Sequence, residues 1–328
     1  MSAEVLVYRG SLVENRHRVS LALWGPEGLV AYGGDPGRVA YLRSSAKPFQ
    51  ALALYLTGAV ERFGLTEEEV ALATASHDGT PRHVEVAARF LGKLGLGPEH
   101  LVCGVHPPFS REARAALEAQ GLAPTPLHHN CSGKHAGMLA AALALGAPAE
   151  GYHLPDHPVQ RLNLATLEAL SGARPGLATD GCSVPTFALS LARAARAFFL
   201  LADPGRAPEA YRTPLLRVRE AMRRHPDLVA GPGSVDTLLM ERLPVVAKRG
   251  ADGYYGLALL EGPRGPLGVA LKVEDGATLA REVAVVALLR ALGLDPGKTP
   301  WDRPPVRHHR GLEAGHPDPG LPPHGRSG

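Results

Sequence analysis

The segment Arg43-Ser44-Ser45-Ala46-Lys47-Pro48 stands where predicted strands give way to a long series of predicted helices. Ser44 and Lys47 are three residues apart at the start of a predicted helix, so one helical turn brings their side chains together. A lysine amine can take a proton from a serine hydroxyl only where burial or nearby positive charge lowers the pKa of the amine. The spacing therefore makes Ser44 a candidate nucleophile and Lys47 its candidate base.

Pro48 limits the geometry of this helix start. It disfavours helical torsions at Lys47 and would clash with the carbonyl of residue 44 in a regular helix. A short 3₁₀ turn leading into the helix would keep Ser44 and Lys47 in contact. Because Ser-x-x-Lys recurs often by chance, an exposed helix start without chemistry is the alternative interpretation.

Apolar periodicity on both sides of this segment predicts the fold. Strands are predicted at both ends of the chain: 5–8, 17–23, 29–32, 243–248, 254–260 and 267–273. Helical patterns fill the interval and return once after it: 48–58, 66–73, 82–95, 110–119, 133–146, 157–170, 185–199, 207–224 and 278–292. This order predicts an α/β fold of the α+β type, with a mixed, mainly antiparallel sheet from both termini and a helix-rich inserted region.

The domain organisation follows from the same order of elements. We expect a single catalytic unit over residues 1–315, with the sheet from about 1–40 and 240–315 and the helical region at about 44–230. The segment 316–328 is rich in Pro, Gly and His, and we expect it to be a disordered tail.

Composition and charge exclude several classes of protein. Of 328 residues, 45% are hydrophobic and 20% are charged, which is typical of a folded globular chain. The net charge is +3 and the basic residues are scattered, so no nucleic-acid-binding surface is predicted. The chain start lacks the pattern of a signal peptide, and the longest uncharged apolar stretch, 136–149, is too short to span a bilayer. We therefore expect a cytoplasmic protein without a membrane segment.

Two further segments add to the Ser-Lys pattern. Ser76-His77-Asp78 follows a predicted helix, and Lys248-Arg249-Gly250 closes an apolar strand late in the chain. The order Ser-x-x-Lys, Ser-x-Asp, Lys-x-Gly is that of serine acyl-transfer folds in which a sheet lysine faces the nucleophile across a cleft. Taken singly, Ser76 could end a helix and Lys248 could be a strand-end charge. Together they favour an acyl-transferring hydrolase.

The cysteines point to a third kind of chemistry. Cys131 lies in His128-His129-Asn130-Cys131-Ser132-Gly133-Lys134-His135, which opens a predicted helix, and Asp180-Gly181-Cys182 precedes another. Two thiols, an imidazole and a carboxylate at two helix starts are compatible with a zinc site, and Lys134 is one turn from Cys131. The alternative is that helix N-termini favour such residues without any metal. Cys103, in an apolar run, is expected to be a packing residue.

With these residues in view, the chain resembles the L-asparaginase II family, the serine-dependent asparaginases of the rhizobial inducible type, over roughly residues 5–315. The motifs that carry the resemblance are Glu14-Asn15-Arg16-His17, Arg43-Ser44-Ser45-Ala46-Lys47-Pro48, Ala75-Ser76-His77, Cys131-Ser132-Gly133-Lys134-His135, Asp180-Gly181-Cys182 and Ala247-Lys248-Arg249-Gly250. The chain departs from the family pattern at Asn15 and in its His-rich segment 307–310.

The resemblance implies hydrolysis of L-asparagine to L-aspartate and ammonia, on a fold similar to serine β-lactamases and glutaminases. Carried over by position, it implies two Ser-Lys tandems and a zinc ion in a homodimeric enzyme. The tandems are Ser44 with Lys47 and Ser76 with Lys248, and the zinc ligands are Cys131, Lys134 and Cys182.

An amino-acid substrate also presents a carboxylate and an ammonium group. Arg43 is a candidate for the carboxylate, Asp180 for the ammonium, and His135 for a further polar contact. One methylene in a pocket discriminates weakly, so a glutaminase is a close alternative. A β-lactam-type serine hydrolase and a zinc-stabilised, noncatalytic binding protein are also compatible with these residues.

Overall fold

The computed structural model describes residues 3–307, 310, 313–320 and 324–325. The chain divides into two compact units, each built from separate stretches of sequence. The sheet unit comprises Met1–Ser45, Ala188–Asp203 and Arg242–Gly328, and the helical unit comprises Ala46–Phe187 and Pro204–Glu241.

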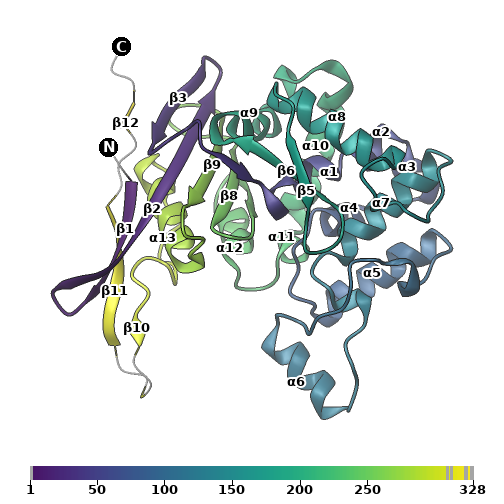
Figure 1. The fold of residues 1–328 in the computed structure, drawn as a ribbon, viewed down its shortest axis with the longest axis horizontal. Helices are drawn as coiled ribbons and strands as arrows, with labels where there is room; N and C mark the ends of the chain where they lie inside the picture. The colour runs from purple at the N-terminus through teal and green to yellow at the C-terminus, as the bar shows by residue number, and fades with distance from the viewer. Residues whose placement is uncertain (1–2, 308–309, 311–312, 321–323, 326–328) are drawn as a thin grey trace. The chain divides into compact units, whose positions relative to one another are not determined.

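A large antiparallel sheet forms the core of the sheet unit (Figure 1). Its strands are β1 (Ala3–Arg9), β2 (Leu12–Gly25), β3 (Gly28–Gly33), β7 (Val245–Arg249), β8 (Tyr254–Leu259), β9 (Leu267–Val273), β10 (Val306–Arg307), β11 (Glu313–Gly320) and β12 (His324–Gly325). The order is β10-β11-β1-β2-β9-β8-β7, with β3 beside β2 and β12. Early strand β2 pairs with late strand β9, with Leu21 opposite Leu271. The predicted antiparallel sheet from both ends of the chain is therefore confirmed.

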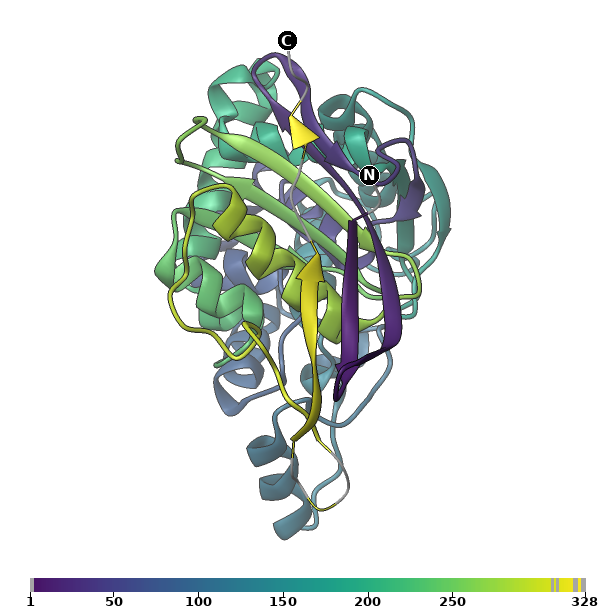
Figure 2. The same cartoon turned by 90° about the vertical axis from the view of Figure 1, so that its left-hand side faces the viewer.

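Two helices cover this sheet. α9 (Leu191–Ala202) packs on β2, β8 and β9, and α13 (Thr278–Ala291) lies against the other face, in front of the strands in Figure 2. Glycines allow the close approach of α9, because a Cβ at Gly256 would lie 1.9 Å from the Phe198 ring and one at Gly268 would lie 2.1 Å from Ala195 O.

The helical unit holds most of the helices of the protein that the structure describes. They are α1 (Lys47–Gln50), α2 (Ala53–Leu56), α3 (Ala59–Phe63), α4 (Glu67–Ala73), α5 (Pro81–Lys93), α6 (Arg111–Ala119), α7 (Ser132–Ala144), α8 (Pro158–Ser171), α10 (Glu209–Arg224), α11 (Pro226–Val229) and most of α12 (Val235–Arg242). α7 is its central helix, because every residue from Ser132 to Ala142 is buried. Within the described ranges, the structure contains no helix that is long and apolar enough to cross a membrane.

Several elements differ from the sequence expectations, including α3, α11 and α12, which no helical pattern predicted. The helix expected at 48–58 is broken into α1 and α2, and the one expected at 185–199 begins as strand β6 (Pro185–Ser190). β6 ends where the Ser190 hydroxyl caps α9 by accepting a hydrogen bond from the Arg193 amide. β6 pairs through Ala188–Ser190 with β4 (Val39–Tyr41), a strand that the sequence pattern did not indicate.

The last residues also depart from the expected tail at 316–328. Residues 316–320 belong to β11, which pairs antiparallel with β1, and Tyr8 stacks on His316 with ring centroids 5.6 Å apart. Backbone pairing with a neighbouring strand needs no apolar pattern, which is why this segment carries no strand signal in the sequence. Residues 321–323 and 326–328 of that prediction lie outside the described residues.

Candidate active site

The amine of Lys47 is the centre of a buried polar cluster in the helical unit. Lys47 is the first residue of α1, and its side chain is only 1% exposed. Its Nζ donates to Ala75 O at 2.5 Å and lies 2.8 Å from Ser76 Oγ and 3.2 Å from Cys131 Sγ. One amine therefore contacts a carbonyl, a hydroxyl and a thiol from two other segments of the chain.

The backbone holds Ser76 at this amine. α4 ends at Ala73, and after a turn at Thr74 the chain continues past Ser76 without regular secondary structure. The Ser76 amide donates to Val229 O at 2.9 Å, and the His77 amide donates to Asn130 O at 3.2 Å. These bonds fix the segment between α11 and the start of α7, so the Ser76 hydroxyl has little freedom to leave Lys47.

Burial and neighbouring sulfur set the charges of the cluster. Burial lowers the pKa of Lys47, and the charge of Lys134 adds to this effect. A hydrogen bond from Cys182 and the two lysine charges hold the pKa of Cys131 well below its ordinary value. Hydrogen bonding to Cys131 and burial raise the pKa of Cys182. The opposite directions of these two shifts favour the thiolate form at Cys131 over Cys182.

The three predicted zinc ligands come together in the same unit. Lys134 Nζ donates to Cys182 Sγ at 2.8 Å, and Cys131, Lys134 and Cys182 are each at most 5% exposed. The part of the chain that the structure describes contains no group of three His, Cys, Asp or Glu side chains arranged as a metal site. Two sulfurs and an amine at contact distance fit a zinc ion only if Lys134 loses its proton. Burial opposes the charge of Lys134, but Cys182 and Cys131 outweigh burial and raise its pKa.

His135 points an unpartnered nitrogen into the buried interior of this unit. Tyr152 Oη accepts the Val102 amide hydrogen at 3.2 Å and lies 2.6 Å from His135 Nδ1. Burial raises the pKa of Tyr152, so the phenol keeps its proton, and Nδ1 is its acceptor within the described structure. His135 Nε2 must then carry the ring hydrogen, and it is buried with no hydrogen-bond partner among the described residues. A buried donor of this kind is suited to a ligand acceptor.

Asp180 lies near the same cluster but is less buried. Its carboxylate accepts the Gly181 amide hydrogen at 2.8 Å, and its charge contributes to the raised pKa of Lys134. The carboxylate is therefore close enough to Lys134 to act on it electrostatically.

The remaining predicted residues belong to the sheet unit. Ser45 Oγ donates to Lys248 O at 2.7 Å, and the side chain of Lys248 is fully buried. A Cβ at Gly250 would lie 2.6 Å from Leu42 O, so the end of β7 lies directly against the segment that carries Ser44. This close approach explains the glycine at position 250, two residues after Lys248, since a larger residue could not fit there.

The turn that presents Ser44 is strained. The predicted 3₁₀ turn is present at Arg43–Ala46, and Arg43 has a φ of 50°, in the left-handed region. The Arg43 guanidinium forms an ion pair with Asp252, whose φ of 55° is also left-handed. Ser44 is partly exposed, and within the described structure its hydroxyl has no hydrogen bond. Strain next to a free hydroxyl is a recurrent feature of reactive positions.

The structure therefore forms two groups of predicted site residues. Lys47, Ser76, Cys131, Lys134 and Cys182 meet in the helical unit, with His135 and Asp180 beside them, whereas Arg43, Ser44 and Lys248 belong to the sheet unit. The contacts of Ser44 and Lys248 with Lys47 remain predictions. Sequence reasoning missed Tyr152. Its role depends on a hydrogen bond with the His135 side chain, a tertiary contact that no short motif signals.

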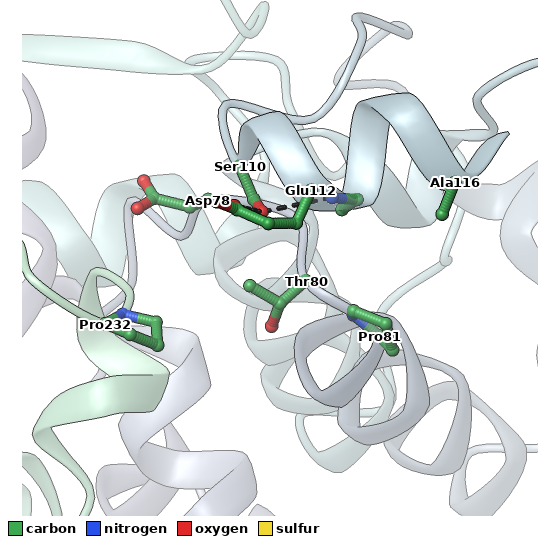
Figure 3. A pocket seen from close by; sticks show the side chains of 8 residues that line it. Asp78, Thr80, Pro81, Ser110, Glu112, Ala116 and Pro232 are labelled. Carbon is green, nitrogen blue, oxygen red and sulfur yellow. Dashed lines mark hydrogen bonds between the residues drawn. The ribbon is translucent and has the colours of Figure 1, made fainter. Parts of the chain in front are cut away.

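The helical unit also contains a cavity of about 470 Å³ (Figure 3). Its lining residues are Asp78, Thr80, Pro81, Ser110, Glu112, Ala113, Ala116 and Pro232. The Ser110 amide donates to Asp78 O at 2.9 Å, which ties the start of α6 to the chain just after Ser76. Asp78, part of the predicted Ser-x-Asp motif, thus contributes to the cavity wall.

Comparisons with known proteins match the chain to one family and to several solved structures. A model of the L-asparaginase II family matches residues 5–319, nearly the whole chain. A search of curated proteins finds no match. Among solved structures, the chain is similar to a probable glutaminase from Bacillus subtilis complexed with 6-diazo-5-oxo-L-norleucine, at 14% identity over 84% of each chain with a TM-score of 0.42. It is also similar to a protein described as Mglu in its native form, at 16% identity over 86% of this chain and 66% of that chain, with a TM-score of 0.46. These identities and TM-scores are too low to assign an activity.

Proposed function

Because the chain belongs to the L-asparaginase II family, which makes it an amidohydrolase, we propose that it hydrolyses L-asparagine to L-aspartate and ammonia. The observation that carries the chemistry is the buried Lys47 amine, which lies 2.8 Å from the Ser76 hydroxyl and 3.2 Å from the Cys131 sulfur. Burial lowers the pKa of the Lys47 amine, which favours its action as a general base.

The reaction is a two-step acyl transfer. Ser44 Oγ forms a bond to the side-chain amide carbon while its proton passes to Lys47. The C–N bond then breaks, the nitrogen takes the proton from Lys47, and ammonia leaves. Water attacks the resulting ester and gives one proton to Lys47. The bond between the acyl carbon and Ser44 Oγ breaks, Lys47 passes this proton to Ser44 Oγ, and L-aspartate is released. The left-handed Arg43 preceding Ser44 supports this assignment, because it presents the hydroxyl on a strained turn.

Ser76 and Lys248 act as the second Ser-Lys tandem. Ser76 can pass a proton to or from Lys47, since its hydroxyl already contacts that amine at 2.8 Å. Lys248 is fully buried at the end of β7, so its charge is costly unless a partner neutralises it. A proton shared between two such lysines through a hydroxyl keeps both from being charged at once.

Three residues hold the substrate in this proposal. Arg43 binds the α-carboxylate, which must share the guanidinium with Asp252. Asp180 binds the α-ammonium, and the buried His135 Nε2–H donates to a substrate oxygen. A charged clamp at both α-groups favours a free amino acid over a peptide.

We propose zinc and self-association as further properties of the enzyme. Cys131, Lys134 and Cys182 would hold the ion, and a bound zinc would supply a Lewis acid and tie the start of α7 to the Asp180–Cys182 turn. We also propose that the enzyme is a homodimer, an assignment that rests on the family and that light scattering can test.

Ammonia release tests the function directly. Wild type, Ser44→Ala, Ser76→Ala and the control Ser110→Ala, which removes the hydroxyl that caps α6, are assayed with asparagine and glutamine. We expect wild type to prefer asparagine, Ser44→Ala to lose at least about 1,000-fold in kcat/KM, and Ser110→Ala to keep its rate.

Each other outcome revises a stated part of the proposal. Faster turnover of glutamine makes the enzyme a glutaminase. Full activity in Ser44→Ala with none in Ser76→Ala makes Ser76 the nucleophile. A wild type that is folded and binds zinc but hydrolyses neither amide supports a noncatalytic binding protein.

A further inference from the structure

His77 connects the catalytic segment to the start of α7 through its side chain. The ring is fully buried, its Nδ1 accepts the Gly79 amide hydrogen at 3.1 Å, and its Nε2 lies 2.8 Å from Ser132 Oγ. Because Nδ1 is an acceptor, Nε2 carries the hydrogen and donates it to Ser132. Ser132 Oγ in turn donates to Leu127 O at 3.1 Å. Donor and acceptor are thereby assigned for each hydrogen bond from Gly79 through His77 and Ser132 to Leu127.

The bridge joins the two segments that meet at Lys47. His77 directly follows Ser76, and Ser132 directly follows Cys131. Lys47 Nζ contacts both Ser76 Oγ and Cys131 Sγ. The backbone adds a second link, from the His77 amide to Asn130 O at 3.2 Å. The His77–Ser132 bond and this backbone bond together join the two segments that carry the hydroxyl and the thiol at Lys47.

We propose that His77 is a positioning residue, which holds Ser76 at the distance from the start of α7 that the proton relay through Lys47 requires. The inference rests on the proposed function and extends it to a residue that touches neither substrate nor Lys47. His77 stays neutral in this role, because burial, with the charges of His83 and Lys47, holds its pKa well below the ordinary value.

His83 provides a matched control in the same unit. It is 1% exposed and stacks on His77, with ring centroids 4.8 Å apart. Its Nδ1 accepts the Thr80 amide hydrogen at 3.1 Å, and its Nε2 lies 2.9 Å from Asp227 O. His83 therefore resembles His77 in burial and bonding, but its hydrogen bonds join α5 to α11 and do not reach Ser132 or the start of α7.

Two conservative substitutions separate the bonds of His77. An Asn oxygen can replace Nδ1 as acceptor for Gly79 but does not reach Ser132, whereas a Gln amide can replace the Nε2–H that donates to Ser132. kcat, KM and melting temperature are measured for His77→Asn, His77→Gln and His83→Asn. We expect His77→Asn to lower kcat by about 10- to 100-fold with KM within about threefold of wild type, since small misplacements of reacting groups cost this much.

We expect His77→Gln to recover most of that kcat, and His83→Asn to lower the melting temperature as much as His77→Asn while keeping wild-type kcat. Equal kcat in His77→Asn and His83→Asn overturns the proposal, as does equal loss in the Asn and Gln variants of His77. If His77→Asn does not fold, Ser132→Ala removes the same bond, and wild-type kcat in that variant is equally decisive. A wild type that hydrolyses neither asparagine nor glutamine refutes the proposed function itself. If the wild type is active, the variants test only the positioning role of His77.

Discussion

Gly133→Ala is expected to separate α4 from α7 and thereby disturb the cluster at Lys47. Gly133 lies in the first turn of α7, between Cys131 and Lys134. A Cβ at this position would lie 2.2 Å from Leu72 O and 2.6 Å from Leu72 Cγ in α4. The main obstacle is a backbone oxygen, which cannot rotate away as a flexible side chain would.

The size of the disturbance follows from these distances. Ordinary van der Waals contact begins near 3.4 Å, so the two helices must separate locally by ~1.2 Å. α7 carries Cys131 and Lys134, whereas α4 leads into Ala75 and Ser76, and Lys47 bridges the two sides. A displacement of about 1 Å at such groups costs on the order of 100-fold in rate, and the overpacking itself costs about 1–3 kcal/mol of stability.

The assay compares Gly133→Ala with Gly137→Ala, one turn further along α7. A Cβ at Gly137 would lie 3.1 Å from Ala73 Cβ, a contact that small shifts can relieve. We expect Gly137→Ala to keep its rate of ammonia release and Gly133→Ala to lose about 100-fold in kcat/KM. Urea unfolding of both variants, with circular dichroism, shows whether Gly133→Ala is folded in the assay. A folded Gly133→Ala with the kcat/KM of Gly137→Ala would refute the reasoning.

Two further predictions concern the cysteines. Cys131→Ser and Cys182→Ser are each expected to lose bound zinc after dialysis, by elemental analysis, while Cys103→Ala retains it; unchanged metal in both serine variants contradicts the ligand assignment. Burial raises the pKa of Cys103 from 9.0 to about 12, so the folded protein keeps a proton that the unfolded chain loses. The protonated Cys103 thiol therefore contributes fully to the free energy of unfolding below pH 9. This contribution is lost as pH rises toward 12, at up to about 1.4 kcal/mol per pH unit. Between pH 8.5 and 10.5, the free energy of unfolding measured in urea should fall less in Cys103→Ala than in wild type. An equal fall in both proteins would contradict the assignment.

The parts of this protein that were predictable from sequence are those that depend on neighbours along the chain. Apolar periodicity predicts the strands near both ends and most helices between them, and the steric effect of Pro48 predicts the 3₁₀ turn at Arg43–Ala46. A sheet shared by the two ends of the chain was also predictable, because strands at both ends need partners to bury their apolar faces, but the pairing of β2 with β9 comes from the structure. The candidate residues themselves follow from chemistry at short spacing.

Contacts between distant segments could not be read in this way. Tyr152 and Val102 are 50 residues apart, yet they form a hydrogen bond at the same phenol that contacts His135 Nδ1. His77 and Ser132 are 55 residues apart, and nothing at either position signals the other. Such pairs depend on how helices pack, because side-chain spacing repeats only within one element and carries no information on the path between elements. The chemistry of each group is thus a local property of the chain, whereas its protonation and its partners arise from packing that brings distant groups out of water together.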